Sequence, residues 1–114
     1  MNMKMREKKN VTLMKKMGTS LPEQTLDDIR SECLGMGVSM RKFATEQVRR
    51  FFNKRAPVRS FHLYETEHSI PIGFPFDEVL RSHLVTEARQ RRMRPAALLR
   101  EILLGHIHEE NKPF

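Results

Sequence analysis

One pattern occurs twice along the 114 residues of the chain. In each case a short segment of alternating apolar and polar residues ends at a proline and is followed by two amphipathic helical patterns. The alternating segments cover residues 15–21 and 69–74, and the prolines are Pro22 and Pro75. Alternation with a period of two predicts a strand with one buried face. Because one strand and two helices cannot enclose a core, the repeat predicts that two such units interlock.

The first unit carries clear signals for the ends of its helices. Pro22 is suited to the first position of a helix, which we expect to run to about residue 34. Gly37 can adopt the left-handed conformation that ends a helix, and Ser39 is a good N-cap. A second helix is therefore expected over residues 40–52.

The second unit follows the same order. After Pro75 we expect a helix over residues 76–90, a break at Arg91–Arg94 and a last helix that Pro95 opens. The helix pairs superpose at an offset of 55 residues, which pairs Ile29 with Leu84, Cys33 with Ala88 and Phe43 with Leu98. The strands are not expected to keep this offset, because it places Pro22 on Asp77. We therefore expect the second helix pair to begin about half a turn earlier.

These features resemble the ribbon-helix-helix family of Arc-, MetJ- and CopG-type DNA-binding proteins. The matching stretches are Ser20-Leu21-Pro22-Glu23 with Gly37-Val38-Ser39-Met40, and Gly73-Phe74-Pro75-Phe76 with Met93-Arg94-Pro95-Ala96. The resemblance implies a mainly α fold with a short two-stranded antiparallel β-ribbon, in which two units (β-α-α-β-α-α) form a pseudo-symmetric single domain. Whether the strands pair within one chain or between two chains stays open.

The segments outside the repeat complete the expected organisation. We expect a flexible basic arm at 1–14, the two units at 15–53 and 68–107, a linker at 54–67 and a tail at 108–114. With no apolar run near the ~20 residues that span a bilayer, we expect a cytoplasmic protein that does not bind membranes. The single cysteine, Cys33, suits a reducing compartment and is expected in the core.

The charge of the chain favours an anionic partner. A formal net charge of +7 and an isoelectric point near 10.1 concentrate anions at the surface, and nucleic acid is the first candidate. The resemblance implies sequence-specific binding of double-stranded DNA through the ribbon in the major groove, and action as a transcriptional regulator.

The resemblance also implies which residues contact DNA. With Leu21 and Phe74 facing the core, the outward residues expected to read bases are Lys16, Gly18, Ser20, Ser69 and Gly73, with Pro71 beside them. The second strand offers few hydrogen-bonding groups, so a non-palindromic target is expected. Phosphates are expected at the start of each second helix. The residues there are Ser39, Met40 and Arg41 in the first unit and Arg91, Arg92 and Arg94 in the second.

Other functions fit the same sequence. An accessory protein of plasmid transfer, acting in a relaxosome, is one alternative, and an antitoxin-like or adaptor module that binds a co-encoded protein is another. Leu99 and Leu104 lie beyond the expected core stripe, which suggests self-association on adjacent DNA sites. No catalytic constellation is present, so neither an enzyme nor a cofactor is expected. His106 and His108 lack the spacing of two ligands on one helix face, so no metal site is expected.

Overall fold

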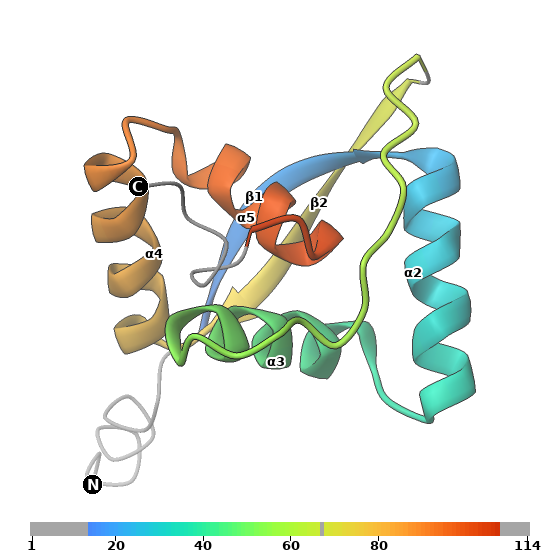
Figure 1. Cartoon of the computed structure of the whole chain (residues 1–114), viewed down its shortest axis with the longest axis horizontal. Coiled ribbons are helices and arrows are strands. Elements are labelled where there is room, and N and C mark those ends of the chain that lie inside the picture. Colours follow the sequence, from blue (N-terminus) through green and yellow to red (C-terminus); the bar gives the residue numbers. More distant parts are fainter. Residues whose placement is uncertain (1–13, 67, 108–114) are drawn as a thin grey trace, which may run out of the picture.

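The computed structural model describes residues 14–66 and 68–107. This part of the chain is mainly helical, with one two-stranded antiparallel sheet and four helices (Figure 1). The elements are β1 (Lys15–Pro22), α2 (Glu23–Met36), α3 (Met40–Phe52), β2 (Ser69–Phe76), α4 (Glu78–Gln90) and α5 (Pro95–Leu104). The expected order of strand, two helices, strand, two helices is confirmed.

Prolines hold the register of the ribbon. Gly18 lies opposite Gly73 at its centre, and Pro22, Pro71 and Pro75 all occupy the same alternate phase of the ladder. Proline has no N–H to donate, so the hydrogen-bonded pairs are the positions between them. A slip of one residue would place prolines in the ladder and turn the buried face of the strand outward. The sequence therefore permits one register.

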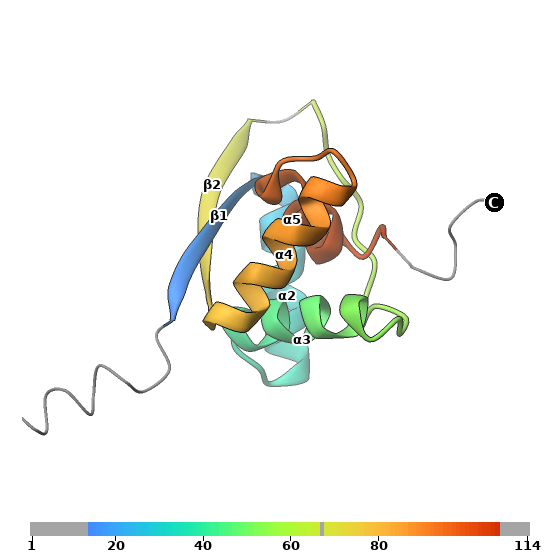
Figure 2. The same ribbon diagram turned by 90° about the vertical axis from the view of Figure 1, so that its left-hand side faces the viewer.

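All four helices lie on one side of the ribbon, and the core fills the space between (Figure 2). Leu21, Phe74 and Phe76 point from the ribbon into this core, where each is at most 4% exposed. Helix α5 packs against β1 and helix α3 packs against β2, and the two helices contact each other. The second helix of each half thus covers the strand of the other half, and neither half could bury its apolar face alone.

The end of the second strand differs from the sequence prediction. Strand β2 continues through Pro75 to Phe76, and α4 begins at Glu78 after Asp77. The N–H of Leu80 donates to Asp77 Oδ1 at 2.8 Å, which caps the helix. The prediction that Pro75 ends the strand and that the helix starts at residue 76 was wrong. Pro75 sits where the ladder needs no N–H, so it does not stop the strand.

The repeat is more regular than the sequence indicated. The N-caps of α2 and α4 are Pro22 and Asp77, which are 55 residues apart. The prediction that the strands break this offset was therefore wrong. Gly37 and Arg92 lie at the same offset, and both adopt left-handed backbone conformations, with φ of 71° and 59°. One offset therefore relates the two halves from strand to turn.

Local signals at the helix ends are confirmed. Helix α2 runs two residues further than the predicted end at 34, and Gly37 closes it with an N–H bond to the Leu34 carbonyl at 3.2 Å. Ser39 caps α3, and its Oγ accepts from the Lys42 N–H at 3.0 Å. Pro95 opens α5 as predicted, and the helix ends at Leu104 rather than near residue 107.

The segment between α3 and β2 is joined to the core through one buried amide. Gln47 is 1% exposed, and its Oε1 accepts from the Val58 N–H at 2.6 Å. Its Nε2 lies 3.3 Å from the carbonyl oxygens of both Arg59 and Ile102. This side chain ties the linker, α3 and α5 together.

The linker also contributes to the core. Phe61 is 7% exposed and packs edge to face against Phe43, with ring centres 5.9 Å apart. Its N–H donates to the Leu104 carbonyl at 2.7 Å. Next to Leu104, Gly105 has a φ of 77°, and a β-carbon there would run into the Arg59 carbonyl. The sequence gave no periodic signal for these contacts, and the linker was expected only to connect.

Two predictions about individual residues have opposite outcomes. Leu99 and Leu104 are both completely buried, so the prediction that they lie outside the core was wrong, and with it the basis for self-association through them. Cys33 is buried as expected, and burial, followed by the charge of Glu32, raises the pKa of its thiol. The protonated thiol is a weak nucleophile, which fits a packing role.

None of the helices that the structure describes combines the length and the apolar composition that crossing a bilayer requires.

We predict that Gln47→Leu lowers the free energy of unfolding by about 1–3 kcal/mol, because it leaves the buried Val58 N–H without its acceptor. Urea denaturation measures this change. Gln90→Leu, at an exposed position of α4, serves as the control and should stay within about 0.5 kcal/mol of the parent. Equal stability of the two variants would show that Gln47 does not hold the linker.

Candidate nucleic-acid interface

The outer face of the ribbon carries the residues predicted to read bases. Exposure alternates along both strands, and Lys16, Gly18, Pro71 and Gly73 are exposed while Ser20 and Ser69 are partly buried. Lys16 lies opposite Pro75, and Ser20 lies opposite Pro71. No described element covers this face (Figure 2). The structure thus brings the predicted residues of both strands together on one open surface.

The centre of this face is shallow because two glycines meet there. Gly18 and Gly73 form a pair without side chains, within an open hollow of about 510 Å³. The aliphatic stem of Lys16 lies along Gly73, since a β-carbon added there would be 3.4 Å from Lys16 Cδ. Lys16 therefore reaches across the ribbon toward the second strand, and a flat object could approach the backbone closely.

Helix α5 begins beside the ribbon. The Thr19 hydroxyl, on the inner face of β1, donates to the Ala96 carbonyl at 2.7 Å. The N–H groups of Ala97 and Leu98 bond to the Arg94 carbonyl at 3.0 Å, and Pro95 has no N–H. Few backbone donors are thus left at this helix start to bind an anion, so the charge of Arg94 must supply most of the attraction.

The start of helix α3 is built differently. Ser39 is exposed and caps the helix, while Met40 is partly buried and packs against both clusters of the core. Its side chain is therefore not available to a ligand. Arg41 and Lys42 are both exposed. Lys42 was not among the predicted site residues, although its place one residue after Arg41 at a helix start could have indicated it.

The arginines of the turn before α5 fall into two groups. Arg91 Nε lies 2.7 Å from Glu87 Oε2, and its guanidinium lies 5.2 Å from the centre of the Phe51 ring. Arg91 therefore has a structural role in this state. Arg92 and Arg94 are exposed, so they can contact a phosphate.

Arg92 occupies an unfavourable backbone conformation. Its φ of 59° lies in the left-handed region, where its counterpart in the first half is Gly37. A β-carbon in this region costs about 1–2 kcal/mol. Residues that keep such strain are frequent at functional sites. The strain and exposure of Arg92 together make it a candidate contact residue.

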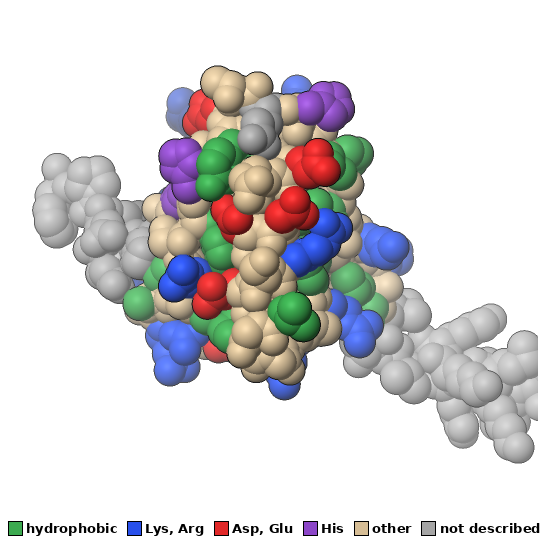
Figure 3. Space-filling model, turned by 90° about the vertical axis from the view of Figure 1, so that its right-hand side faces the viewer, with side chains coloured by type: hydrophobic (Ala, Val, Ile, Leu, Met, Phe, Trp, Pro, Cys, Tyr) green, Lys and Arg blue, Asp and Glu red, His purple; other side chains and the backbone are tan. Residues whose placement is uncertain are grey.

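The charges on the surface are not evenly distributed. The outward residues of the ribbon include Lys16 and no carboxylate. The face formed by α2 instead presents acidic and basic side chains together (Figure 3). Helix α2 contributes Glu23, Asp27, Asp28 and Glu32 to that mixture. Between these two faces, the ribbon is the better surface for a polyanion.

The described residues contain no group of three or more histidines, cysteines or carboxylates that could hold a metal ion. His106 contacts protein groups instead, with Nδ1 3.2 Å from Glu101 Oε1 and Nε2 2.8 Å from the Phe61 carbonyl. His108 lies outside the described residues, as do residues 1–13 of the expected basic arm and the tail from 108 to 114.

Comparison of the chain with protein-family models, curated proteins and solved structures finds no match. The function of the outer face therefore has to be inferred from its geometry and charge.

We predict that Arg92→Gly raises the free energy of unfolding by about 1 kcal/mol, because glycine adopts the left-handed conformation without strain. The matched control is Arg89→Gly in the last turn of α4, which should lower stability by about 1 kcal/mol. Thermal and urea denaturation measure both changes. A loss of stability in both variants would contradict the strain assigned to Arg92.

Proposed function

We propose that the chain binds double-stranded DNA in a sequence-specific manner by inserting its ribbon into the major groove. The observation that carries this proposal is the uncovered outer face of the β1–β2 pair, with its cation and its flat glycine centre. The major groove is about 12 Å wide and accepts a two-stranded ribbon. Four helices behind the ribbon would hold it rigid during docking.

The proposed architecture is a single-chain ribbon-helix-helix domain with pseudo-two-fold symmetry. The constant offset supports it, because Gly18 and Gly73 correspond to each other and also lie opposite each other. A two-fold axis relating the halves would pass through this pair. The exchange of helices between the strands, with α5 on β1 and α3 on β2, also supports it.

Base reading is expected to be uneven. On β1, Lys16 can donate to guanine O6 and N7, and the Ser20 hydroxyl can donate or accept. On β2, Pro71 and Gly73 present no side-chain hydrogen-bonding group, which leaves Ser69 near one end. A non-palindromic target follows, in which the half facing β1 is read more stringently.

Phosphate contacts would come from the exposed cations at the starts of α3 and α5. Arg41 and Lys42 belong to the first helix start, and Arg92 and Arg94 belong to the second. Four such contacts correspond to a slope of about −3.6 in a plot of log affinity against log salt concentration. We further propose a role in regulating transcription, because a target read on one strand of the ribbon gives the bound protein a direction on DNA.

We predict that Lys16→Ala lowers the preference for the selected site over random DNA by about 1–3 kcal/mol, because it removes a base contact. The target is first obtained by selecting bound fragments from random DNA. Binding of the selected and random duplexes is then compared by fluorescence anisotropy. Retention of full preference in Lys16→Ala would exclude reading by the ribbon.

We predict that Arg92→Ala weakens binding to selected and random duplexes alike, since a phosphate contact carries no sequence information. The salt slope should become shallower by about one. Arg55→Ala, an exposed linker arginine, is the matched control and should change neither affinity nor slope. A selective loss on the chosen site alone would assign Arg92 to base reading instead.

A further inference from the structure

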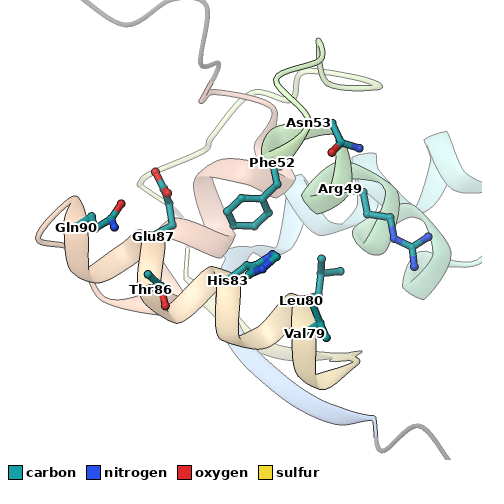
Figure 4. Close-up of a pocket in the computed structure, with 9 residues that line it drawn as sticks. All are labelled: Arg49, Phe52, Asn53, Val79, Leu80, His83, Thr86, Glu87 and Gln90. Atoms are coloured by element: carbon teal, nitrogen blue, oxygen red, sulfur yellow. The ribbon is translucent and has the colours of Figure 1, made fainter.

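A groove opens between α3 and α4, away from the outer face of the ribbon (Figure 4). It measures about 500 Å³ and is lined by residues of α3 and its C-cap from Arg49 to Asn53 and by residues of α4 from Val79 to Gln90. On its apolar floor, the Phe52 ring meets the His83 ring edge to face with centres 5.5 Å apart. Val79 is 64% exposed beside them.

The offset of 55 residues identifies a counterpart of this groove between α5 and α2. The counterpart is already filled by the linker. Phe61 is buried there, the Thr25 hydroxyl donates to the His62 carbonyl at 3.1 Å, and the Tyr64 hydroxyl donates to Asp28 Oδ2 at 3.3 Å. An extended segment with an aromatic anchor is thus what one of these two helix pairs accepts.

The open groove carries different chemistry at the matching positions. Leu80 corresponds to Thr25, so the floor is more apolar. His83 corresponds to Asp28, so a potential base replaces an acid. Arg49 corresponds to Leu104 and adds a cation at the rim (Figure 4). The groove therefore does not suit a second copy of the linker, whose Tyr64 hydroxyl needs the carboxylate of Asp28.

The charges at the rim select the kind of ligand. Arg49 is exposed and makes no ion pair with the residues that the structure describes. Glu87, the carboxylate that lines the groove, is engaged by Arg91 at 2.7 Å. The charge left uncompensated is therefore positive. An acidic side chain on a ligand would be attracted to Arg49 and could accept a hydrogen bond from His83.

We propose that the groove between α3 and α4 binds an extended segment of a partner protein. The segment has an aromatic or leucine residue that fills the floor beside Phe52 and Val79, and an acidic residue next to it that pairs with Arg49. This interaction goes beyond DNA binding, and it uses a surface between the helices, so partner and DNA can be held at the same time.

The test is a selection of random octapeptides displayed on phage against the full chain. We expect the selected peptides to share an aromatic or leucine residue with an acidic residue within two or three positions. A selected peptide is then synthesised with a fluorescent label and titrated with the protein in the absence of DNA. Its affinity should fall at least tenfold with Arg49→Glu and about threefold with the milder Arg49→Gln. Arg55→Glu, a charge reversal outside the groove, should leave it within twofold.

Three results would overturn the proposal. The first is a selection that yields no peptide whose binding depends on Arg49. The second is a set of peptides without the acidic residue. The third is peptide binding that the chain gains only in Phe114→Ala, which would assign the groove to the chain's own C-terminal residues. Because the titration contains no DNA, its outcome does not depend on the proposed function of the ribbon.

Discussion

The antiparallel pairing of β1 with β2 is the interaction on which the rest of the structure depends. It joins the two halves of the chain, and it fixes which helix covers which strand, because α5 packs on β1 and α3 on β2. Each half would otherwise expose an apolar strand face and two half-covered helices. Pro71 and Pro75 restrict the pairing to one register, since proline is tolerated only where the ladder needs no N–H. The flat outer face is a direct result of that register, which sets Gly18 against Gly73.

The two halves share a backbone and differ in their chemistry. At the turn between the helices, Gly37 in one half corresponds to the strained Arg92 in the other. At the start of the second helix, Ser39 caps α3 with its side chain, whereas Arg94 makes no such bond. These differences give a surface with one common geometry and two sets of contacts. An uneven DNA target and one open helix groove both follow from this divergence within the repeat.

Local signals in the sequence were sufficient for most of the fold. Alternation predicted both strands, and Gly37, Ser39 and Pro95 marked helix ends that the structure confirms. Pro75 misled because its effect depends on whether its missing N–H faces the partner strand, which is a non-local property. The roles of Gln47 and Phe61 were invisible for a similar reason, as both act through the linker. At the candidate site, parity alone placed the outward ribbon residues, whereas the pairing of Arg91 with Glu87 required the folded chain.

Interference of DNA methylation with binding tests most directly whether the ribbon reads the major groove. Dimethyl sulfate methylates guanine at N7, in the major groove, and adenine at N3, in the minor groove, so one experiment probes both. We expect guanine methylation within the selected site to abolish binding, most strongly in the half that faces Lys16, while adenine methylation has little effect. Binding that tolerates guanine methylation and is lost on adenine methylation would contradict a ribbon seated in the major groove.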